Sequence, residues 1–406
     1  MTIKKIYGIS RKLLSMRILF NNELFERDHY CGINKYYGIL FNNLPKSIEV
    51  VTPAFIRNPF IKKEKFSNSI FYQKKSFFRG ERKMVFLTFC KKSLPFFGKK
   101  IERLLQKNER IFLKKIQKGD FDILHIDFCW LPSKKAVKMI KKYVKKPILL
   151  TVHDVIGFYT IPTNKDYFKR MELPDESRIL LGIATKIITV SNTTKQDLVR
   201  LYNIDDSKIQ CVYNCCDKYD AETIKNFELP KKYILHVGQR LYRKNFVFFL
   251  NSIREILLED EEIKLVFTFQ EFTDEEKSYA GYLGVLGSCI FVNAESEKNL
   301  AYLYKNALVC AVPTLYEGFG MIIAEAMAYG CPVVTSGVES AMKEIGGNAP
   351  LYFDPLNQKS IHDVTREVLY NENLRQKMRE SGLEQIKKFT PEKMVEGITK
   401  IYNSVS

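Results

Sequence analysis

Short apolar runs alternate with helical patterns along most of the chain. The clearest runs begin at Met16, Asp122, Pro147, Lys186, Tyr233, Ile263, Leu308 and Pro332. Each run is a few residues long and apolar almost throughout, which is typical of strands buried on both faces of a parallel sheet. The segments between them, such as residues 134–146, 245–258 and 391–403, repeat apolar residues at helical spacing. This alternation predicts an α/β protein built on parallel sheets.

The pattern restarts after Asn214, which indicates two domains. We predict an N-terminal extension at residues 1–15, one domain at residues 16–213 and a second at residues 214–378. A last helical stretch at residues 379–406 is expected to pack back on the first domain. A length of 406 residues agrees with this division, because single cores rarely grow much beyond about 250–300 residues.

Charge is distributed unevenly between the two halves. Residues 1–200 contain 41 Lys and Arg against 17 Asp and Glu, whereas the remainder contains 23 against 29. The stretch Arg57–Lys118 is the most basic, and many phenylalanines lie within it. Such a surface attracts polyanions, either nucleic acid or an anionic lipid leaflet. Charge alone leaves a third interpretation open, a solvated basic face with no partner.

Features of membrane insertion and export are absent from the sequence. No run approaches the roughly 18 uncharged apolar residues of a spanning helix. The first 15 residues lack a continuous apolar core and a cleavage site, so a signal peptide is not predicted. The nine cysteines include no CxxC pair and fit reduced thiols. We therefore expect a cytoplasmic protein.

The segment Pro313–Ser336 carries the strongest chemical signal. It reads as a strand, a glycine-containing loop, a helix, a cap at Gly330 and another strand. Gly318 and Gly320 allow a tight bend and a close approach of ligand to backbone. The helix then begins with unpaired N–H groups and a positive dipole end, which suits a diphosphate. Taken singly, Glu317 and Glu325 would be interpreted as surface acids.

The complete string changes that interpretation, because Glu-Gly-Phe-Gly, a second Glu and Ala-Tyr-Gly-Cys-Pro-Val-Val resemble the Glu-x7-Glu signature of family-four (group 1) retaining glycosyltransferases. The resemblance implies a GT-B architecture, with two Rossmann-like domains facing one another across a cleft. It also implies a retaining, metal-independent transferase. The donor would be a nucleotide-diphosphate sugar held mainly by the C-terminal domain.

Three further segments resemble family loops in the same order. Residues 237–245 resemble the donor-phosphate loop, in which an arginine and a lysine hold the diphosphate; these roles fall to Arg240 and Lys244, with Arg243 as the alternative arginine. Residues 30–36 resemble the N-terminal glycine loop, which leaves Gly32 as the residue closest to the phosphates. Residues 151–155 resemble the loop whose histidine contacts the transferred sugar, here His153.

The resemblance thus implies a complete set of site residues. Glu317, which holds the donor sugar, and His153 are the expected catalytic residues. Glu325 is expected to contact the ribose hydroxyls. The expected donor-binding residues are Gly32, Arg240, Lys244, Asn245, Gly318, Phe319, Gly320, Met321, Ile322 and Glu325. No cofactor and no metal are expected. The sequence Asp120-Phe-Asp122 has the form of a metal motif, but it precedes a buried strand and is interpreted as a turn.

The charge distribution and the family resemblance together give the expected partners. They are a UDP-, GDP- or dTDP-linked sugar, a glycan or lipid-linked acceptor, and an anionic membrane contacted by the basic N-terminal half. No nucleic acid is expected, because no DNA- or RNA-binding motif is present. The expected location is cytoplasmic and peripheral on the inner membrane face, with a role in bacterial surface polysaccharide synthesis. A nucleotide-sugar epimerase and a non-catalytic basic binding protein remain as alternatives.

Overall fold

The computed structural model describes residues 15–26, 31–51, 55–62, 64, 66, 70–71, 95–155, 159–160, 169–170, 173–224, 228–294, 296–338 and 340–406. The chain forms two compact units. The first contains Met1–Val190, Thr194–Asn214 and Pro391–Ser406, and the second contains Ser191–Thr193 and Cys215–Thr390. Almost all of the predicted N-terminal extension lies outside the described residues. So do residues 63, 65, 67–69 and 72–94 of the basic stretch.

The first unit is built on a six-stranded parallel sheet with the order β10-β9-β6-β5-β1-β2. Its strands are β1 (Met16–Phe20), β2 (Ile48–Val50), β5 (Ile123–Asp127), β6 (Ile148–Val152), β9 (Lys186–Thr189) and β10 (Ile209–Cys211). Every residue of β5 and β6 is buried, as a strand covered on both faces requires. The predicted strands of this half of the chain are confirmed.

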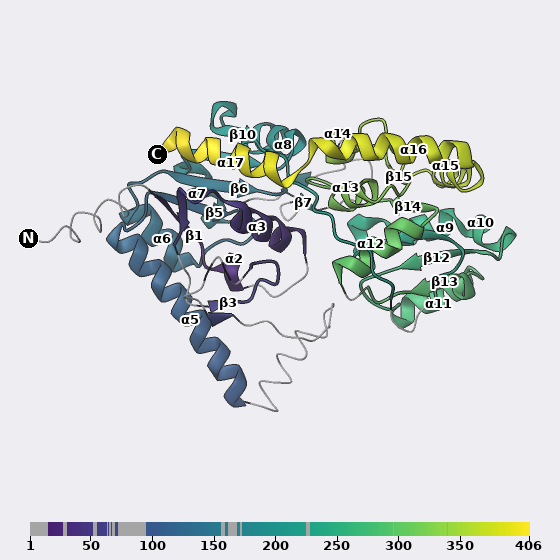
Figure 1. The fold of residues 1–406 in the computed structure, drawn as a ribbon, viewed down its shortest axis with the longest axis horizontal. Coiled ribbons are helices and arrows are strands. Elements are labelled where there is room, and N and C mark those ends of the chain that lie inside the picture. The colour runs from purple at the N-terminus through teal and green to yellow at the C-terminus, as the bar shows by residue number, and fades with distance from the viewer. Residues whose placement is uncertain are drawn as a thin grey trace, which may run out of the picture. The chain divides into compact units, whose positions relative to one another are not determined.

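Helices and two small ribbons complete the first unit (Figure 1). The helices are α2 (Glu23–Glu26), α3 (Gly32–Asn43), α5 (Pro95–Lys118), α6 (Lys134–Tyr143), α7 (Asp175–Ile183), α8 (Asn192–Tyr202), η3 (Asp206–Lys208) and α17 (Pro391–Val405). The ribbons are the parallel pair β3 (Phe55–Ile56) and β4 (Ile70–Phe71), and the antiparallel pair β7 (Tyr159–Thr160) and β8 (Lys169–Arg170).

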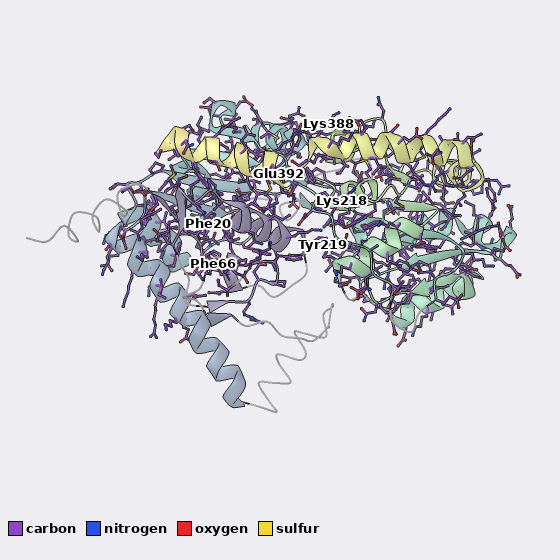
Figure 2. The ribbon with its side chains drawn as sticks, in the orientation of Figure 1. Phe20, Phe66, Lys218, Tyr219, Lys388 and Glu392 are labelled. Carbon is purple, nitrogen blue, oxygen red and sulfur yellow. The ribbon has the colours of Figure 1, made fainter. Side chains whose placement is uncertain are left out.

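Aromatic side chains fill the core beside β1. The ring of Phe41 on α3 lies 4.8 Å from Phe20 and 6.0 Å from Phe66, each in an edge-to-face arrangement. Figure 2 labels both Phe20 and Phe66, which come from segments far apart in the sequence. Phe25 stacks on Phe41 at 5.2 Å. Such pairs add about 0.5–1.5 kcal/mol each beyond the apolar area they bury, so this cluster fixes α2 and α3 against the sheet.

The second unit has another six-stranded parallel sheet, with the order β13-β12-β11-β14-β15-β16. Its strands are β11 (Lys232–His236), β12 (Ile263–Phe267), β13 (Cys289–Phe291), β14 (Val309–Val312), β15 (Val333–Ser336) and β16 (Leu351–Phe353). Its helices are η4 (Tyr242–Lys244), α9 (Phe246–Ser252), α10 (Arg254–Glu259), α11 (Asp274–Tyr282), η5 (Leu286–Ser288), α12 (Glu297–Asn306), α13 (Met321–Ala328), α14 (Ala341–Gly346), α15 (Gln358–Tyr370), α16 (Glu372–Gln385) and η6 (Ile386–Lys388).

One predicted helix, at residues 245–258, is divided in the structure. It forms α9 and α10, with a break at Ile253, whose backbone angles are φ −96° and ψ 6°. The hydroxyl of Ser252 donates a hydrogen bond to the carbonyl of Phe248 at 2.7 Å. A serine that binds the carbonyl four residues earlier bends a helix, which gives the break a local cause.

The C-terminal stretch divides differently from the prediction. Helix α16 runs across the predicted boundary at residue 378 and stays with the second unit. Only α17 belongs to the first unit, where it packs against α3. Its Tyr402 hydroxyl lies 2.7 Å from Nδ1 of the fully buried His125 on β5, whose Nε2 lies 2.7 Å from the hydroxyl of Thr151. Burial lowers the pKa of His125 to about 3, so the ring is neutral.

Tyr402→Phe should therefore lower the stability of the first unit. The substitution leaves Nδ1 of His125 buried without a partner, which costs about 1–3 kcal/mol. Scanning calorimetry should show the loss as a lower unfolding temperature. The control is Tyr370→Phe, whose hydroxyl is 3.4 Å from Asp260 on an exposed side chain. Equal shifts for the two variants would contradict this role of Tyr402.

Candidate functional site

The strand order of the second sheet reverses between β11 and β14, because β12 lies on one side of β11 and β14 on the other. Ligands of parallel α/β sheets bind beyond the carboxyl ends of the strands at such a switch point. Residues 237–245 follow β11 there, and residues 313–320 follow β14. The fold thus brings together the two segments that the sequence predicts to hold the diphosphate.

Hydrogen bonds join these two segments directly. The backbone N–H of Leu315 donates to the carbonyl of Arg243 at 2.8 Å. The hydroxyl of Thr314 donates to the same carbonyl at 3.2 Å. Because the carbonyl of Arg243 accepts both hydrogen bonds, the two segments are held at a fixed separation.

The side chains of Arg243, Lys244 and Glu317 form what we call the charged centre. Lys244 Nζ donates to Glu317 Oε1, and Arg243 Nη1 lies 3.4 Å from the same oxygen. The side chains of Lys244 and Glu317 are only 13% and 15% exposed. Burial raises the pKa of Glu317, but the charges of Lys244 and Arg243 outweigh it and leave the pKa below its ordinary value. Two cations against one carboxylate leave excess positive charge.

Two glycines shape the backbone around the charged centre. Gly238 has φ +102° and Gly320 has φ +91°, a region that other residues enter only with strain. The N–H of Gly238 donates to the hydroxyl of Thr268 at 3.2 Å. Asn245 also has positive φ, and its amide donates to the carbonyl of Pro355 at 2.8 Å. Asn245 thus secures the turn between η4 and α9.

The predicted ligand-binding helix is α13, which begins directly after Gly320. Met321 and Ile322 are its first two residues, so their N–H groups lie at the positive end of the helix dipole.

Phe319 is 5% exposed and packs edge-to-face on Phe389 at 5.6 Å. Glu325 is 9% exposed and accepts a hydrogen bond from the hydroxyl of Tyr304 at 3.1 Å. Gly318 accepts a hydrogen bond from the hydroxyl of Ser191 at 2.6 Å.

Arg240 is engaged away from the charged centre. Its guanidinium makes two hydrogen bonds of 2.7 Å to Glu276 and one of 2.9 Å to each of the carbonyls of Gln270 and Glu271. The side chain is 1% exposed. It also lies 5.0–5.6 Å from three aromatic ring centres, those of Phe246, Phe267 and Phe272. These contacts are those of a residue that holds the fold together.

A second candidate cluster lies at the switch point of the first sheet, between β1 and β5. His153 follows β6, and its Nε2 lies 3.0 Å from Oδ2 of Asp127 at the end of β5. His153 is 8% exposed and Asp127 is fully buried. Asp127 Oδ1 accepts from the N–H groups of Cys129 and Trp130 at 2.8 and 2.9 Å, which fixes the carboxylate.

Asparagine and glutamate residues extend this cluster toward α2. Asn21 accepts a hydrogen bond from the N–H of Asp127 at 3.0 Å and donates to Glu23 at 2.9 Å. Burial raises the pKa of Glu23 to about 7 against the opposing effect of the Asn21 bond. Gly32, the predicted phosphate neighbour, is exposed at the start of α3, whereas Lys35 on the same helix is buried.

Asp127 is the residue that sequence reasoning missed. A signal for it existed, because an aspartate that ends an otherwise apolar strand must find a partner. The position also matches the one that identified His153, at the carboxyl edge of a buried strand. His153 lies 26 residues away, directly after the next strand of the sheet, and only the fold shows that the two side chains meet.

The Asp120-Phe-Asp122 turn has a structural explanation. Asp122 accepts a hydrogen bond from the N–H of Arg17 at 2.7 Å, and Asp120 pairs with the side chains of Arg17 and Lys115. The hydrogen bonds from Arg17 and Lys115 lower the pKa of Asp120. Within the described ranges, no group of three or more His, Cys, Asp or Glu side chains has an arrangement that could hold a metal ion.

Two family models match the chain. "Glycosyl transferases group 1" matches residues 218–385, and "Glycosyltransferase Family 4" matches residues 75–218. The two matches meet at residue 218, close to the break between the structural units. Together they cover most of the chain, including the charged centre, Asp127 and His153.

The chain is also similar to glycosyltransferases of known name. The O-antigen chain mannosyltransferase RfbU of Salmonella typhimurium is 28% identical over 225 residues, which are 54% of this chain and 60% of the relative. O-antigen chain mannosyltransferase B of Escherichia coli is 29% identical over 260 residues, which are 59% of this chain and 66% of the relative. The chain therefore matches less than two thirds of the length of either relative.

A solved structure shows the same fold over nearly the whole chain. HepE of Anabaena, solved in complex with UDP and glucose, aligns with a TM-score of 0.66 at 12% identity and covers 96% of this chain and 100% of its own. Two Rossmann-like units with parallel six-stranded sheets are the GT-B architecture. The family matches and this fold together show that the chain belongs to the family-four, group 1 glycosyltransferases.

Proposed function

We propose that this glycosyltransferase moves a sugar from a nucleotide-diphosphate donor to a glycan or lipid-linked acceptor in bacterial surface polysaccharide synthesis. The observation that carries the proposal is the charged centre of Arg243, Lys244 and Glu317 beside the start of α13. The names of the O-antigen mannosyltransferases support the role in polysaccharide synthesis. They also make mannose the first sugar to test.

The donor diphosphate would bind at the charged centre. Lys244 and Arg243 are fixed by Glu317 and by the joined backbone segments, so their charges need little rearrangement to meet a leaving group. We assign the phosphate-binding arginine to Arg243 rather than Arg240, because the donors of Arg240 already serve Glu276 and two carbonyls. The first amides of α13 would add the positive end of a helix dipole.

The remaining site residues would each contact a different part of the donor. Glu325, which is buried beside Tyr304, would accept hydrogen bonds from the ribose hydroxyls. Glu317 would hold the donor sugar, and His153 would contact the transferred sugar. The acceptor hydroxyl would attack from the face that the diphosphate leaves and pass its proton to a phosphate oxygen, so the anomeric configuration is retained. Since the two cations neutralise the leaving group, the proposed mechanism requires no metal ion and no cofactor.

The acceptor side would work at the inner face of the cytoplasmic membrane. In the part of the chain that the structure describes, no helix combines the length and apolar character needed to cross a bilayer. The excess of basic residues in the first 200 positions supports peripheral attachment to anionic lipid. Nucleic acid is not part of the proposal.

Activity should be sought with a panel of UDP-, GDP- and dTDP-linked sugars and lipid-linked acceptors. One donor should give a glycosylated product, and NMR of that product should show the anomeric configuration of the donor. Inverted configuration would contradict the proposed mechanism. Free epimerised nucleotide sugar without any glycosylated product would contradict transfer itself.

Glu317→Gln should lower the turnover number about 10²–10³-fold, because one preorganised charge contact in the transition state is lost at a cost of roughly 2.7–4 kcal/mol. The amide has the same shape and still accepts a hydrogen bond from Lys244. Calorimetric unfolding of the variant checks that the loss is not a loss of folded protein. Near-normal turnover by folded Glu317→Gln would remove Glu317 from the site.

Arg243→Gln and Arg240→Gln should separate the two arginines. Arg243→Gln should weaken nucleoside-diphosphate binding roughly tenfold or more with little change in unfolding temperature, since one charge-assisted contact is lost. Arg240→Gln should instead lower stability by about 2–3 kcal/mol, because Glu276 and two carbonyls lose their donor. Titration and scanning calorimetry measure the two effects. The assignment of phosphate binding to Arg243 is wrong if Arg240→Gln weakens nucleotide binding and Arg243→Gln lowers stability.

Asp127→Asn should lower turnover roughly tenfold or more while donor binding stays unchanged. The amide oxygen can still accept from Cys129 and Trp130, but the negative charge 3.0 Å from Nε2 of His153 is gone. His153→Asn should lower turnover by a similar factor. The double variant should lose little more than either single variant, because the two residues act as one unit. Multiplicative losses would show independent roles.

A further inference from the structure

Helix α5 carries a stripe of exposed cations along its described side chains. Buried residues recur at every fourth position of the helix, at Asn108, Phe112 and Ile116. The exposed cations occur three or four residues apart, which places them on one side of a helix. They are Lys107, Arg110, Lys114 and Lys118.

Helix α6 carries a second and denser stripe. Its buried residues are Ala136, Val137 and Ile140, which face the body of the unit. The exposed cations of the helix and of the residues that follow it are Lys134, Lys135, Lys138, Lys141, Lys142, Lys145 and Lys146. Tyr143 is 40% exposed, and Lys142 Nζ lies 5.0 Å from its ring centre. A cationic helix surface thus includes an accessible aromatic ring.

The two helices pack against each other, as Figure 1 also shows. The hydroxyl of Ser133, the N-cap of α6, donates to Glu109 on α5 at 2.8 Å. We call the exposed cations of both helices the α5–α6 basic face. Like charges three and four residues apart destabilise a helix, and two adjacent stripes add repulsion between helices. A partner that brings negative charge would remove this repulsion.

Few cations of this face are neutralised within the protein. Lys134 lies 3.6 Å from Glu176 and Lys146 lies 4.0 Å from Asp122. Among the residues that the structure describes, no acidic partner lies within 4.0 Å of Lys135, Lys138, Lys141, Lys142, Lys145, Lys107, Arg110, Lys114 or Lys118. Some lysines of the second unit are paired; Lys232, for example, lies 2.5 Å from Glu262.

We propose that the α5–α6 basic face docks on an anionic lipid surface and holds the first unit at the membrane. The inference rests on the proposed function insofar as a lipid-linked acceptor needs the enzyme at a bilayer. It assigns the contact chiefly to α6, which lies outside the basic stretch Arg57–Lys118 noted in the sequence. The exposed lysines of α6 lie on one side of that helix and can meet a planar charged surface together.

The composition of the face favours lipid over nucleic acid. Each cation close to an anionic leaflet adds to the attraction without needing a specific position. Tyrosine is favoured at the boundary between headgroups and acyl chains, where its ring and hydroxyl both find suitable surroundings, and Tyr143 is placed among the lysines. Sequence-specific binding of nucleic acid would instead require side chains that reach bases or stack on them.

The test compares two triple variants of the full chain. Lys135→Gln, Lys138→Gln and Lys142→Gln remove three cations from the α5–α6 basic face. Lys277→Gln, Lys305→Gln and Lys377→Gln remove three exposed lysines from helices of the second unit and give the same net charge. Glutamine is a good helix former, so both variants should fold.

Binding is measured by cosedimentation with vesicles of phosphatidylcholine alone or mixed with phosphatidylglycerol. Wild-type protein should bind only the mixed vesicles and release in high salt. The face variant should bind them on the order of 100-fold more weakly, since each cation near the surface contributes about fivefold. The second-unit variant should bind like wild type. Equal binding by both variants, or equal binding to uncharged vesicles, overturns the proposal.

Two further measurements separate this proposal from the proposed function. Titration with UDP, GDP and dTDP should give the same affinity for both variants and wild type, because the substitutions lie outside the charged centre. If no nucleotide binds while vesicle binding follows the α6 lysines, the proposed function fails and the docking surface stands. Binding of wild-type protein to duplex DNA but not to anionic vesicles would make the partner a nucleic acid and overturn the lipid proposal.

Discussion

The ion pair between Lys244 and Glu317 joins the two loops on which the proposed chemistry depends. Each residue follows a different strand, and β11 and β14 are neighbours at the point where the strand order reverses. Burying two charges costs several kcal/mol per ion unless each has a partner, and here each has one. Arg243 adds a second cation 3.4 Å from the same carboxylate. The charges of the site are therefore in place before any ligand binds.

This arrangement also explains why a diphosphate is a suitable ligand. Glu317 balances only one of the two cations, and its pKa is lowered, so it stays ionised and keeps both of them in position. A pyrophosphate leaving group gains negative charge as its bond to the sugar breaks. Fixed positive charges stabilise that change more than they stabilise the ground state. The proposed role of the centre thus follows from its charge balance and its rigidity.

Much of the fold and of the candidate site follows from local sequence signals. Apolar runs predicted the strands because both faces of each sheet are covered, and the segment from Glu317 to Glu325 identified the loop and helix by glycine spacing. The break at Ile253 was missed because Ser252 binds a carbonyl in a way that composition does not indicate. The proposed choice of Arg243 over Arg240 as the phosphate-binding arginine needed the fold. Three phenylalanines and Glu276, distant in sequence, enclose Arg240.

The most direct test of the central claim is calorimetric titration of the wild-type chain with matched nucleosides and nucleoside diphosphates. If the charged centre grips the diphosphate through two cations, one nucleoside diphosphate should bind at least about 100-fold more tightly than its nucleoside, since each charge-assisted contact is worth about 1.5–3 kcal/mol. Equal affinity for nucleoside and nucleoside diphosphate, or no binding of either, would contradict the account.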